Sequence, residues 1–195
     1  MSYRKGERAR QEQQTRRRIT EAAVELHRTV GPARTTVKEI AQRAGVGRMT
    51  VYNHFGSDDE LLDACSSHYM AQHPPPDPAP LAAIEDVDDR LDEALRALYT
   101  WFHETQDMTG NALRDAPLVP ALASVMTQGF WPLVDATVEV LLAGRGLRGT
   151  RRGHVRGALL VALDFATWRT LTQAGMDDAG AASTAARFVA AADAG

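Results

Sequence analysis

Two helix-start signals lie close together in the N-terminal third of the chain, at Thr36 and Ser57. Thr36 is followed three positions later by Glu39, which is the spacing of a capping box. Ser57 repeats this pattern with Glu60. Between the two signals, Gly45 falls where a left-handed residue would end a helix. The spacing predicts three short helices, at 37–44, 48–55 and 57–71, with a tight turn at 45–47.

The first two of these short helices carry the pattern of a helix-turn-helix. Ala41 is small where two helices would cross closely, and Gly45 permits the tight turn between them. The positions that would face inward are apolar: Ile40, Ala44, Val46 and Val51. The second helix of such a motif enters the major groove of DNA with its N-terminal residues on the base edges.

Hydrogen-bonding side chains crowd the second helix, and DNA would supply partners for them. Arg48 can donate two hydrogen bonds to one guanine. Thr50, Tyr52 and His54 can donate to phosphate oxygens. The alternative is a solvated amphipathic hairpin with no partner.

The charge distribution favours DNA over that alternative. Residues 1–56 hold 12 Lys and Arg against 5 Asp and Glu, whereas residues 57–195 hold 10 against 20. The net charge of −3 therefore hides a basic front end on an acidic body. This asymmetry predicts that only the front end meets a polyanion.

The rest of the chain has helical periodicity almost throughout, and no segment alternates with a period of two. An apolar stripe predicts a first helix at about 15–30, and PPPDPAP at 74–80 is a stiff linker. Proline at 132 predicts a kink or break. Further helices are predicted at about 86–107, 109–115, 118–143, 150–174 and 178–192. The predicted fold is all-α, with about nine helices: a three-helix helix-turn-helix domain joined to a larger C-terminal helical bundle.

The stretch "TTVKEIAQRAGVGRMTVYNHFGSDDELL" at 35–62 resembles the N-terminal domain of the TetR family of bacterial transcriptional regulators. The matching positions are Thr36, Ile40-Ala41, Ala44-Gly45-Val46, Thr50-Val51-Tyr52, His54-Phe55 and Ser57. "LDFATWRTLTQAG" at 163–175, with the alanine-rich segment after it, is similar to the C-terminal end of the family. The resemblance implies a basic disordered arm at 1–14, a DNA-binding domain at 15–72, a linker at 73–85 and a ligand-binding and dimerisation domain at 86–195.

The resemblance assigns a set of DNA contacts to this chain. The candidate DNA-binding residues are Thr36, Lys38, Arg48, Met49, Thr50, Tyr52, Asn53 and His54. Two positions depart from the family pattern. Gly47 stands where a serine cap is common, and Asp58 stands where a lysine would touch phosphate. An aspartate at that helix start suits the helix dipole but repels DNA.

The resemblance also implies a cavity for a small apolar or aromatic ligand in the acidic bundle. The candidate ligand-binding residues are Trp101, Phe102, Met108, Met126, Phe130, Trp131, Phe165 and Trp168. The alternative for each of them is a place in the core. The break at Pro132 would free the carbonyl of Gln128 as a polar contact for the ligand.

No catalytic residues, cofactor or metal site are predicted, and we expect no enzyme activity. Gly144, Gly146 and Gly149 spell G-x-G-x-x-G, which indicates a dinucleotide site only between a strand and a helix, so a loop between helices is expected. No two histidines have helical ligand spacing. Asp164 is expected at an interface. Cys65, the lone cysteine, is expected to be buried.

These features predict a ligand-responsive regulator, most simply a repressor, released from a palindromic double-stranded operator by a small, largely apolar molecule. The family resemblance implies a homodimer through 150–192. The lone cysteine fits a reducing cytoplasm, and no apolar run is long enough for a membrane span. The alternative is a helical ligand-binding protein or enzyme whose N-terminal domain has lost DNA binding.

Overall fold

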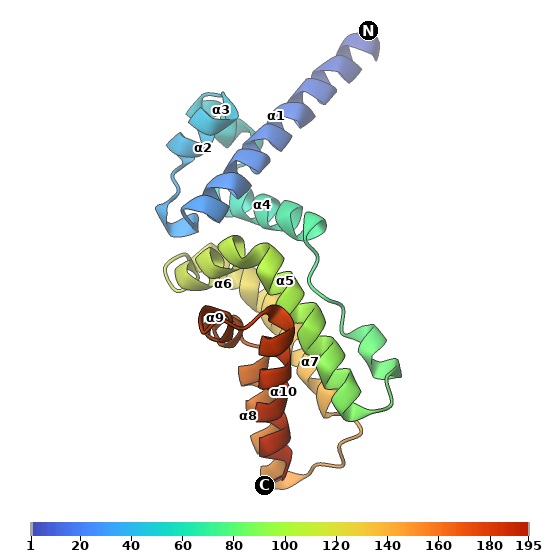
Figure 1. Ribbon diagram of the computed structural model, residues 1–195. Coiled ribbons are helices and arrows are strands. Elements are labelled where there is room, and N and C mark those ends of the chain that lie inside the picture. Colours follow the sequence, from blue (N-terminus) through green and yellow to red (C-terminus); the bar gives the residue numbers. More distant parts are fainter. Residues whose placement is uncertain (1, 195) are drawn as a thin grey trace. The chain divides into compact units, whose positions relative to one another are not determined.

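The computed structural model describes residues 2–194, and every regular element in that range is a helix (Figure 1). The prediction of an all-α fold is confirmed. The α-helices are α1 (Ser2–Thr29), α2 (Val37–Ala44), α3 (Arg48–His54), α4 (Asp58–Gln72), α5 (Val87–Asp115), α6 (Pro120–Val125), α7 (Trp131–Leu142), α8 (Gly149–Ala162), α9 (Phe165–Gln173) and α10 (Asp178–Ala194). Between them lie the 3-10 helices η1 (Pro32–Arg34) and η2 (Ala79–Ala83) and the π-helical turn η3 (Met126–Phe130).

The capping signals start α2 and α4 as the sequence predicts. The Thr36 hydroxyl accepts from the amide of Glu39 at 3.3 Å, and the Glu39 carboxylate accepts from the amide of Thr36 at 2.8 Å. The Ser57 hydroxyl accepts from the amide of Glu60 at 3.1 Å. The return bond of Glu60 goes instead to the amide of Gly56, at 2.9 Å. The second capping box is therefore shifted by one residue on its return side.

The helix-turn-helix prediction is confirmed by α2 and α3. Gly45 ends α2 in the left-handed conformation, with φ of 67°. The apolar residues between α2, α3 and α1 are buried: Ile40, Ala41, Ala44 and Val51. Gly47 precedes α3 without a side-chain cap, in agreement with the predicted departure at this position.

The first helix is longer than the sequence predicts. Residues 2–14, expected as a disordered arm, form the first half of α1. The arginines, glutamines and glutamates of this segment are good helix formers. Residues 6–14 are exposed, so this part of α1 adds charge without adding core.

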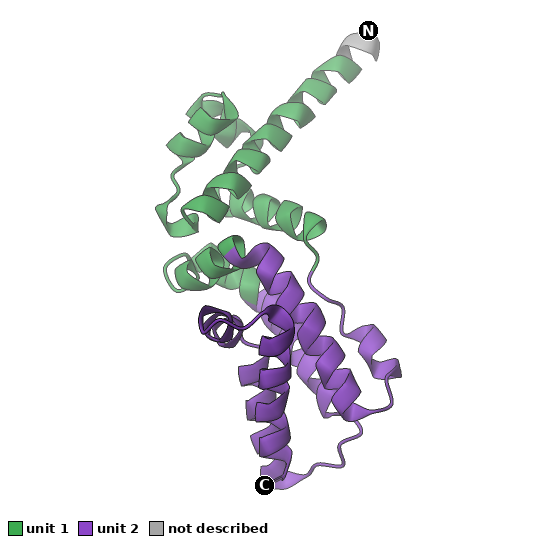
Figure 2. Cartoon of the chain, in the orientation of Figure 1, with its two compact units in different colours: residues 1–74, 107–126 green, residues 75–106, 127–195 purple. Residues whose placement is uncertain are grey.

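The chain divides into two compact units (Figure 2). The first contains residues 1–74 and 107–126, so the end of α5 and all of α6 group with the helix-turn-helix. The second contains residues 75–106 and 127–195.

The helices predicted separately at 86–107 and 109–115 are one helix, α5.

Two other helix predictions differ from the structure. The predicted helix 118–143 is interrupted by η3, and Pro132 is the second residue of α7, where its missing amide donor costs nothing. The predicted helix 150–174 is two helices, because Asp164 caps the start of α9. Its carboxylate accepts from the amide of Ala166 at 2.6 Å. Asp164 is therefore an exposed helix cap, a role that the sequence did not predict.

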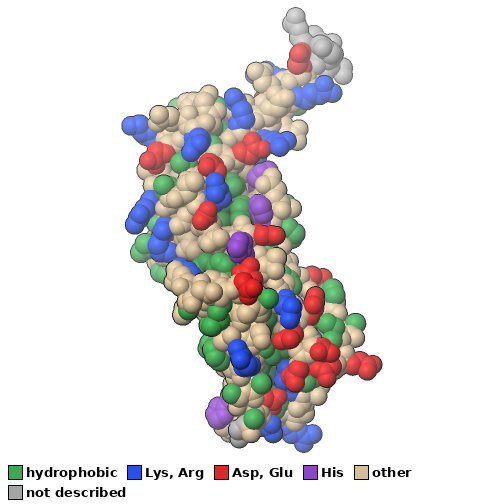
Figure 3. Space-filling view, viewed as in Figure 1, with side chains coloured by type: hydrophobic (Ala, Val, Ile, Leu, Met, Phe, Trp, Pro, Cys, Tyr) green, Lys and Arg blue, Asp and Glu red, His purple; other side chains and the backbone are tan. Residues whose placement is uncertain are grey.

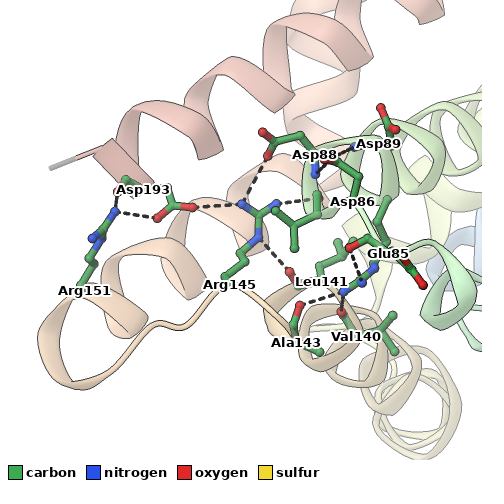
Figure 4. Close-up of polar contacts among 12 residues, drawn as sticks. Glu85, Asp86, Asp88, Asp89, Val140, Leu141, Ala143, Arg145, Arg151 and Asp193 are labelled. Atoms are coloured by element: carbon green, nitrogen blue, oxygen red, sulfur yellow. Dashed lines mark hydrogen bonds and ion pairs between the residues drawn. The ribbon is translucent and has the colours of Figure 1, made fainter.

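Two arginines tie the ends of helices together in the second unit (Figure 4). The Arg90 guanidinium donates to the carbonyls of Ile84 and Ala143, at 2.6 and 2.8 Å. The Arg145 guanidinium donates to the carbonyl of Val87 at 2.9 Å and pairs with Asp193 at 3.0 Å. These bonds fasten the start of α5 to the loop after α7 and to α10. That loop contains Gly144 and Gly146, and Gly149 is the first residue of α8; all three have positive φ, as expected of a connection between helices.

Candidate DNA-binding surface and ligand cavity

The recognition helix α3 has one inner and one outer face. Val51 and the following Phe55 are each 1% exposed and hold the helix against α1 and α2. On the outer face Met49 is 71% exposed and Tyr52 43%. Arg48 and Asn53 are exposed with them, whereas Thr50 and His54 are half-buried. The fold thus presents a polar helix face to solvent.

Arg16, on α1, fixes the end of this helix, and nothing in the sequence pattern singled it out. Its guanidinium donates to the carbonyl of His54, the last residue of α3. It also lies 4.1 Å from the ring centre of Phe55 and pairs with Glu60 at 3.4 Å. The orientation of α3 therefore depends on a cation held between three partners.

A hollow of about 600 Å³ in the first unit brings several predicted DNA contacts together. Thr36 and Lys38 line it from the start of α2, and Arg48 and Tyr52 line it from α3. Asp58 and its neighbour Asp59 lie on the same hollow. The departure noted at Asp58 therefore places negative charge beside the candidate DNA contacts.

The end of α5 holds the end of α1 within the first unit. The Asn111 side-chain amide donates to the carbonyls of His27 and Arg28, at 3.1 and 2.8 Å. Arg114 donates to the carbonyl of Val30 at 3.1 Å, and the carboxylate of the buried Asp115 accepts from the amide of Ala33 at 3.0 Å. The bonds from Asn111 and Arg114 satisfy carbonyls that the end of α1 leaves without partners, and the bond to Asp115 satisfies the amide of Ala33 in η1.

A buried histidine and the lone cysteine pack together beneath this contact. Nδ1 of His27 lies 3.4 Å from Sγ of Cys65. Burial lowers the pKa of His27 to about 4, against a smaller opposing effect of Asp115. Burial raises the pKa of Cys65 to about 12. The thiol is therefore protonated and unreactive, and the prediction that Cys65 is buried is confirmed.

A cavity of about 480 Å³ lies in the second unit, between the proline-rich linker with η2 on one side and α5 and α7 on the other. Its lining is mostly apolar. The lining residues are Pro75, Pro76, Asp77, Pro78, Pro80, Leu81, Ile84, Asp89, Glu93, Ala94, Ala97, Leu98, Trp101, Phe102, Phe130, Leu133, Val134, Thr137 and Leu163. The proline-rich linker, expected to be a stiff spacer, therefore also forms one wall of the cavity.

Three predicted ligand-binding residues line this cavity: Trp101, Phe102 and Phe130. Phe165 and Trp168 do not, because they form the core behind Phe102, with ring centres 5.2 and 5.9 Å from that of Phe102.

The other predicted ligand contacts lie elsewhere. Trp131 is 47% exposed and packs on Phe130 with ring centres 4.9 Å apart. Met108 and Met126 belong to the first unit. Gln128, the predicted polar contact, is exposed and does not line the cavity.

The alanine-rich face of α10 serves the chain's own core. Ala181, Ala182 and Ala185 are buried against neighbouring helices, and α10 packs along α8. Other positions of the two helices expose large apolar side chains: Leu160, Val161 and Phe188, which are 39%, 54% and 46% exposed. The buried alanines are therefore not available to a second copy of the chain, whereas these three side chains are.

Two negative findings concern the described residues. No helix among residues 2–194 has the length and apolar character to cross a membrane. No group of three His, Cys, Asp or Glu side chains in that range could hold a metal ion.

The second helix of this helix-turn-helix has a buried inner face and an exposed polar outer face, with basic residues nearby. This arrangement is typical of DNA-binding proteins of the helix-turn-helix class. The family model described as bacterial regulatory proteins of the tetR family, TetR_N, matches residues 19–65. Over these residues the chain is similar to the TetR family. It is 39% identical over 82 residues to the probable HTH-type transcriptional regulator ArpR of Pseudomonas putida, across 41% of this chain and 36% of ArpR. The chain matches about a quarter to a third of the length of the first curated relatives.

Solved structures share the fold over nearly the whole chain. A TetR-like transcriptional regulator from Rhodococcus sp. RHA1 superposes with a TM-score of 0.63, at 20% identity, over 93% of this chain and 96% of that one. FadR from Thermus thermophilus, a TetR-family transcriptional repressor solved in complex with lauroyl-CoA, gives a TM-score of 0.52, at 24% identity, over 89% and 92%. At these identities the likeness concerns the fold.

Proposed function

We propose that this chain is a ligand-responsive transcriptional repressor that binds a palindromic operator as a homodimer and leaves it when a small, largely apolar molecule binds. The observation that carries the proposal is the outer face of α3, with Arg48, Met49, Tyr52 and Asn53 turned to solvent on a helix whose inner face is buried. A solvated hairpin has no need of such a face, whereas DNA supplies base edges and phosphate oxygens as partners for these side chains.

The remaining predicted contacts fit the same role. Thr36 and Lys38 flank the hollow beside Arg48, where they suit phosphate oxygens. His54 and Thr50 are half-buried and reach the DNA backbone more easily than the bases. The basic residues of α1 extend the positive surface.

The homodimer is supported by the exposed apolar side chains of Leu160, Val161 and Phe188 on α8 and α10. One recognition helix contacts only a few base pairs, so a specific regulator needs two related by a two-fold axis. Covering these side chains with a second copy would build a four-helix bundle from two α8–α10 pairs.

Ligand control is supported by the cavity and by the continuity of α5. Ala97 and Trp101 on α5 line the cavity, and Asn111 on the same helix holds the end of α1. A ligand that moves α5 would therefore strain the contact that positions the helix-turn-helix. It would release DNA only by binding the DNA-free state more tightly.

A gel-shift titration with the DNA upstream of the protein's own gene tests the proposal. We expect a discrete complex that an Arg48→Ala/Tyr52→Phe double variant fails to form. A folded protein that binds the specific fragment no better than random DNA would contradict the regulator.

That outcome would favour a ligand-binding protein or enzyme whose N-terminal domain has lost DNA binding. Asp58 and Asp59 on the hollow are the observation that favours this second candidate. Restoring a lysine with Asp58→Lys separates the two, because it should strengthen an existing operator complex but create none where the other contacts are lost.

A further inference from the structure

The charged side chains that line the cavity of the second unit are all acidic. Asp77, Asp89 and Glu93 line it, and no Lys, Arg or His does so among the residues that the structure describes. Figure 3 shows acidic side chains gathered beside apolar ones around η2 and the start of α5. Asp77 is occupied in part, because its carboxylate accepts from the amide of Ala79 at 2.9 Å. The carboxylates of Asp89 and Glu93 take part in no ion pair within the described part of the chain.

The arginines around the start of α5 do not neutralise these two carboxylates. Arg96, three residues after Glu93, forms no ion pair within the described part of the chain and does not line the cavity. Arg90 donates to main-chain carbonyls, among them those of Ile84 and Val140. Arg145 pairs with Asp88 and Asp193. Both guanidinium groups are used in joining helix ends, and neither lines the cavity. The acidic end of the cavity therefore has no cation of its own.

The acidic and aromatic parts of the lining lie at opposite ends of one stripe. Asp89, Glu93, Ala97 and Trp101 follow one another at intervals of four, so they share a face of α5. With a rise of 1.5 Å per residue, Glu93 is about 12 Å and Asp89 about 18 Å along the helix from Trp101. The carboxylates are exposed, whereas Trp101 is 7% exposed. The cavity thus runs from a wet, negative end to a dry, aromatic one.

Stabilisation of the helix start does not account for both carboxylates. Asp89 lies in the first turn of α5, where a negative charge favours the helix dipole. Glu93 lies one turn further, and the dipole effect fades beyond the first turn. Glu93 therefore gains little from the helix end, and its carboxylate is available to a ligand at the open end of the cavity.

We propose that the cavity takes a cationic amphiphile, with an amine or quaternary ammonium head at Asp89 and Glu93 and an apolar body along Ala97, Leu98 and Trp101. The inference rests on the ligand-responsive function proposed above and names the class of its ligand. An anionic amphiphile would set its charge beside two carboxylates with no cation to pair. A neutral one gains nothing from the two carboxylates, which stay in contact with water. A cation pairs with both carboxylates while its apolar body lies along the apolar lining.

Three probes of equal chain length test the charge preference on the full chain without DNA: decyltrimethylammonium, decanoate and 1-decanol, each below its micelle concentration. Affinities come from calorimetry and from tryptophan fluorescence. We expect the cation to bind about tenfold more tightly than decanoate, since each partly exposed carboxylate contributes a modest attraction. High salt should reduce the preference.

Two double variants of equal charge locate that preference. Asp89→Asn/Glu93→Gln should bring the two charged probes to within about threefold of each other while decanol binding stays unchanged. Asp92→Asn/Glu104→Gln removes the same charge from α5 outside the cavity and should keep the preference. Equal affinities for cation and decanoate in the unchanged protein, a preference that survives the first variant, or no binding of any probe would each overturn the inference.

Addition of operator DNA separates this inference from the function on which it rests. Selective binding of the cation without release of DNA would support the ligand class and contradict the release mechanism. Release by decanoate, but not by the cation, would support ligand control and contradict the class.

Discussion

Arg48 and Tyr52 lie one turn apart on the outer face of α3, yet they have different chemistry. A guanidinium can read a guanine edge, whereas a phenol hydroxyl donates a single bond that suits any phosphate. Specificity and overall affinity for DNA are therefore expected to depend on different side chains of the same helix face.

We predict that Arg48→Ala costs about 1–3 kcal/mol on the cognate operator and relaxes specificity at one base pair. Tyr52→Phe should weaken binding to all sequences alike, because it removes a phosphate contact. Gel shifts against operators mutated one position at a time measure both effects. Equal, sequence-independent losses from the two variants would refute the role of Arg48.

The buried imidazole of His27 predicts a pH dependence of stability. Its pKa is about 4 in the folded chain and about 6.5 when unfolded, so the unfolded chain binds the proton more tightly between those values. The free energy of unfolding should keep its full value above pH 6.5 and fall by up to about 3 kcal/mol as the pH drops towards 4. Urea unfolding at several pH values measures this. A His27→Gln variant should be flat through the window, and a matching decline in that variant would assign the effect to other groups.

Helix starts and stops were predictable where a local hydrogen bond decides them. Thr36, Gly45 and Ser57 act through bonds within a few residues, and the structure has all three as expected. The continuity of α5 could not be predicted in this way. Gly110 weakens a helix locally, but the bonds from Asn111 to the end of α1 hold the helix together through it.

The two candidate sites also differ in how far local sequence patterns determine them. The outer face of α3 follows from helical period, so its exposed residues could be read from the sequence. The cavity depends on where the linker packs, and no local pattern brings Pro78 or Leu81 opposite Trp101. The sequence therefore left open whether Phe165 and Trp168 lie in the core or in the cavity lining, and the structure places them in the core.

The exposed first half of α1 predicts a salt effect. If its arginines meet phosphates, log affinity for DNA falls by nearly one unit per neutralised phosphate for each tenfold rise in salt. Deleting residues 1–14 should flatten that slope while leaving Arg16 and the fold of the helix-turn-helix in place. Binding titrations across a salt series test this, and an unchanged slope would mean that the segment does not touch DNA.

At the scale of the whole molecule, the helices α8 and α10 offer two chemically different faces. The alanine face around Ala185 is used within the chain, and the face with Val161 and Phe188 is turned outward. A substitution on each face should therefore have a different outcome.

We predict that Phe188→Glu yields a folded monomer with little affinity for the operator, because a charge replaces an exposed aromatic ring at the proposed interface. Ala185→Glu should instead unfold the chain, since an unpaired buried charge costs about 4 kcal/mol or more. Analytical ultracentrifugation and circular dichroism distinguish these results. The unchanged dimer should protect two operator half-sites about 34 Å apart, or a multiple of that distance. An operator complex formed tightly by a monomeric Phe188→Glu variant would contradict the dimer.

The grouping of residues 107–126 with the helix-turn-helix limits how this protein can be recombined with others. A chimera joined in the proline-rich linker would inherit the N-terminal segment without Asn111, Arg114 and Asp115, and the carbonyls at the end of α1 would lose their donors. Grafting residues 1–74 together with 107–126 keeps those bonds. The two units are therefore interleaved along the chain, and a single cut in the proline-rich linker does not separate them.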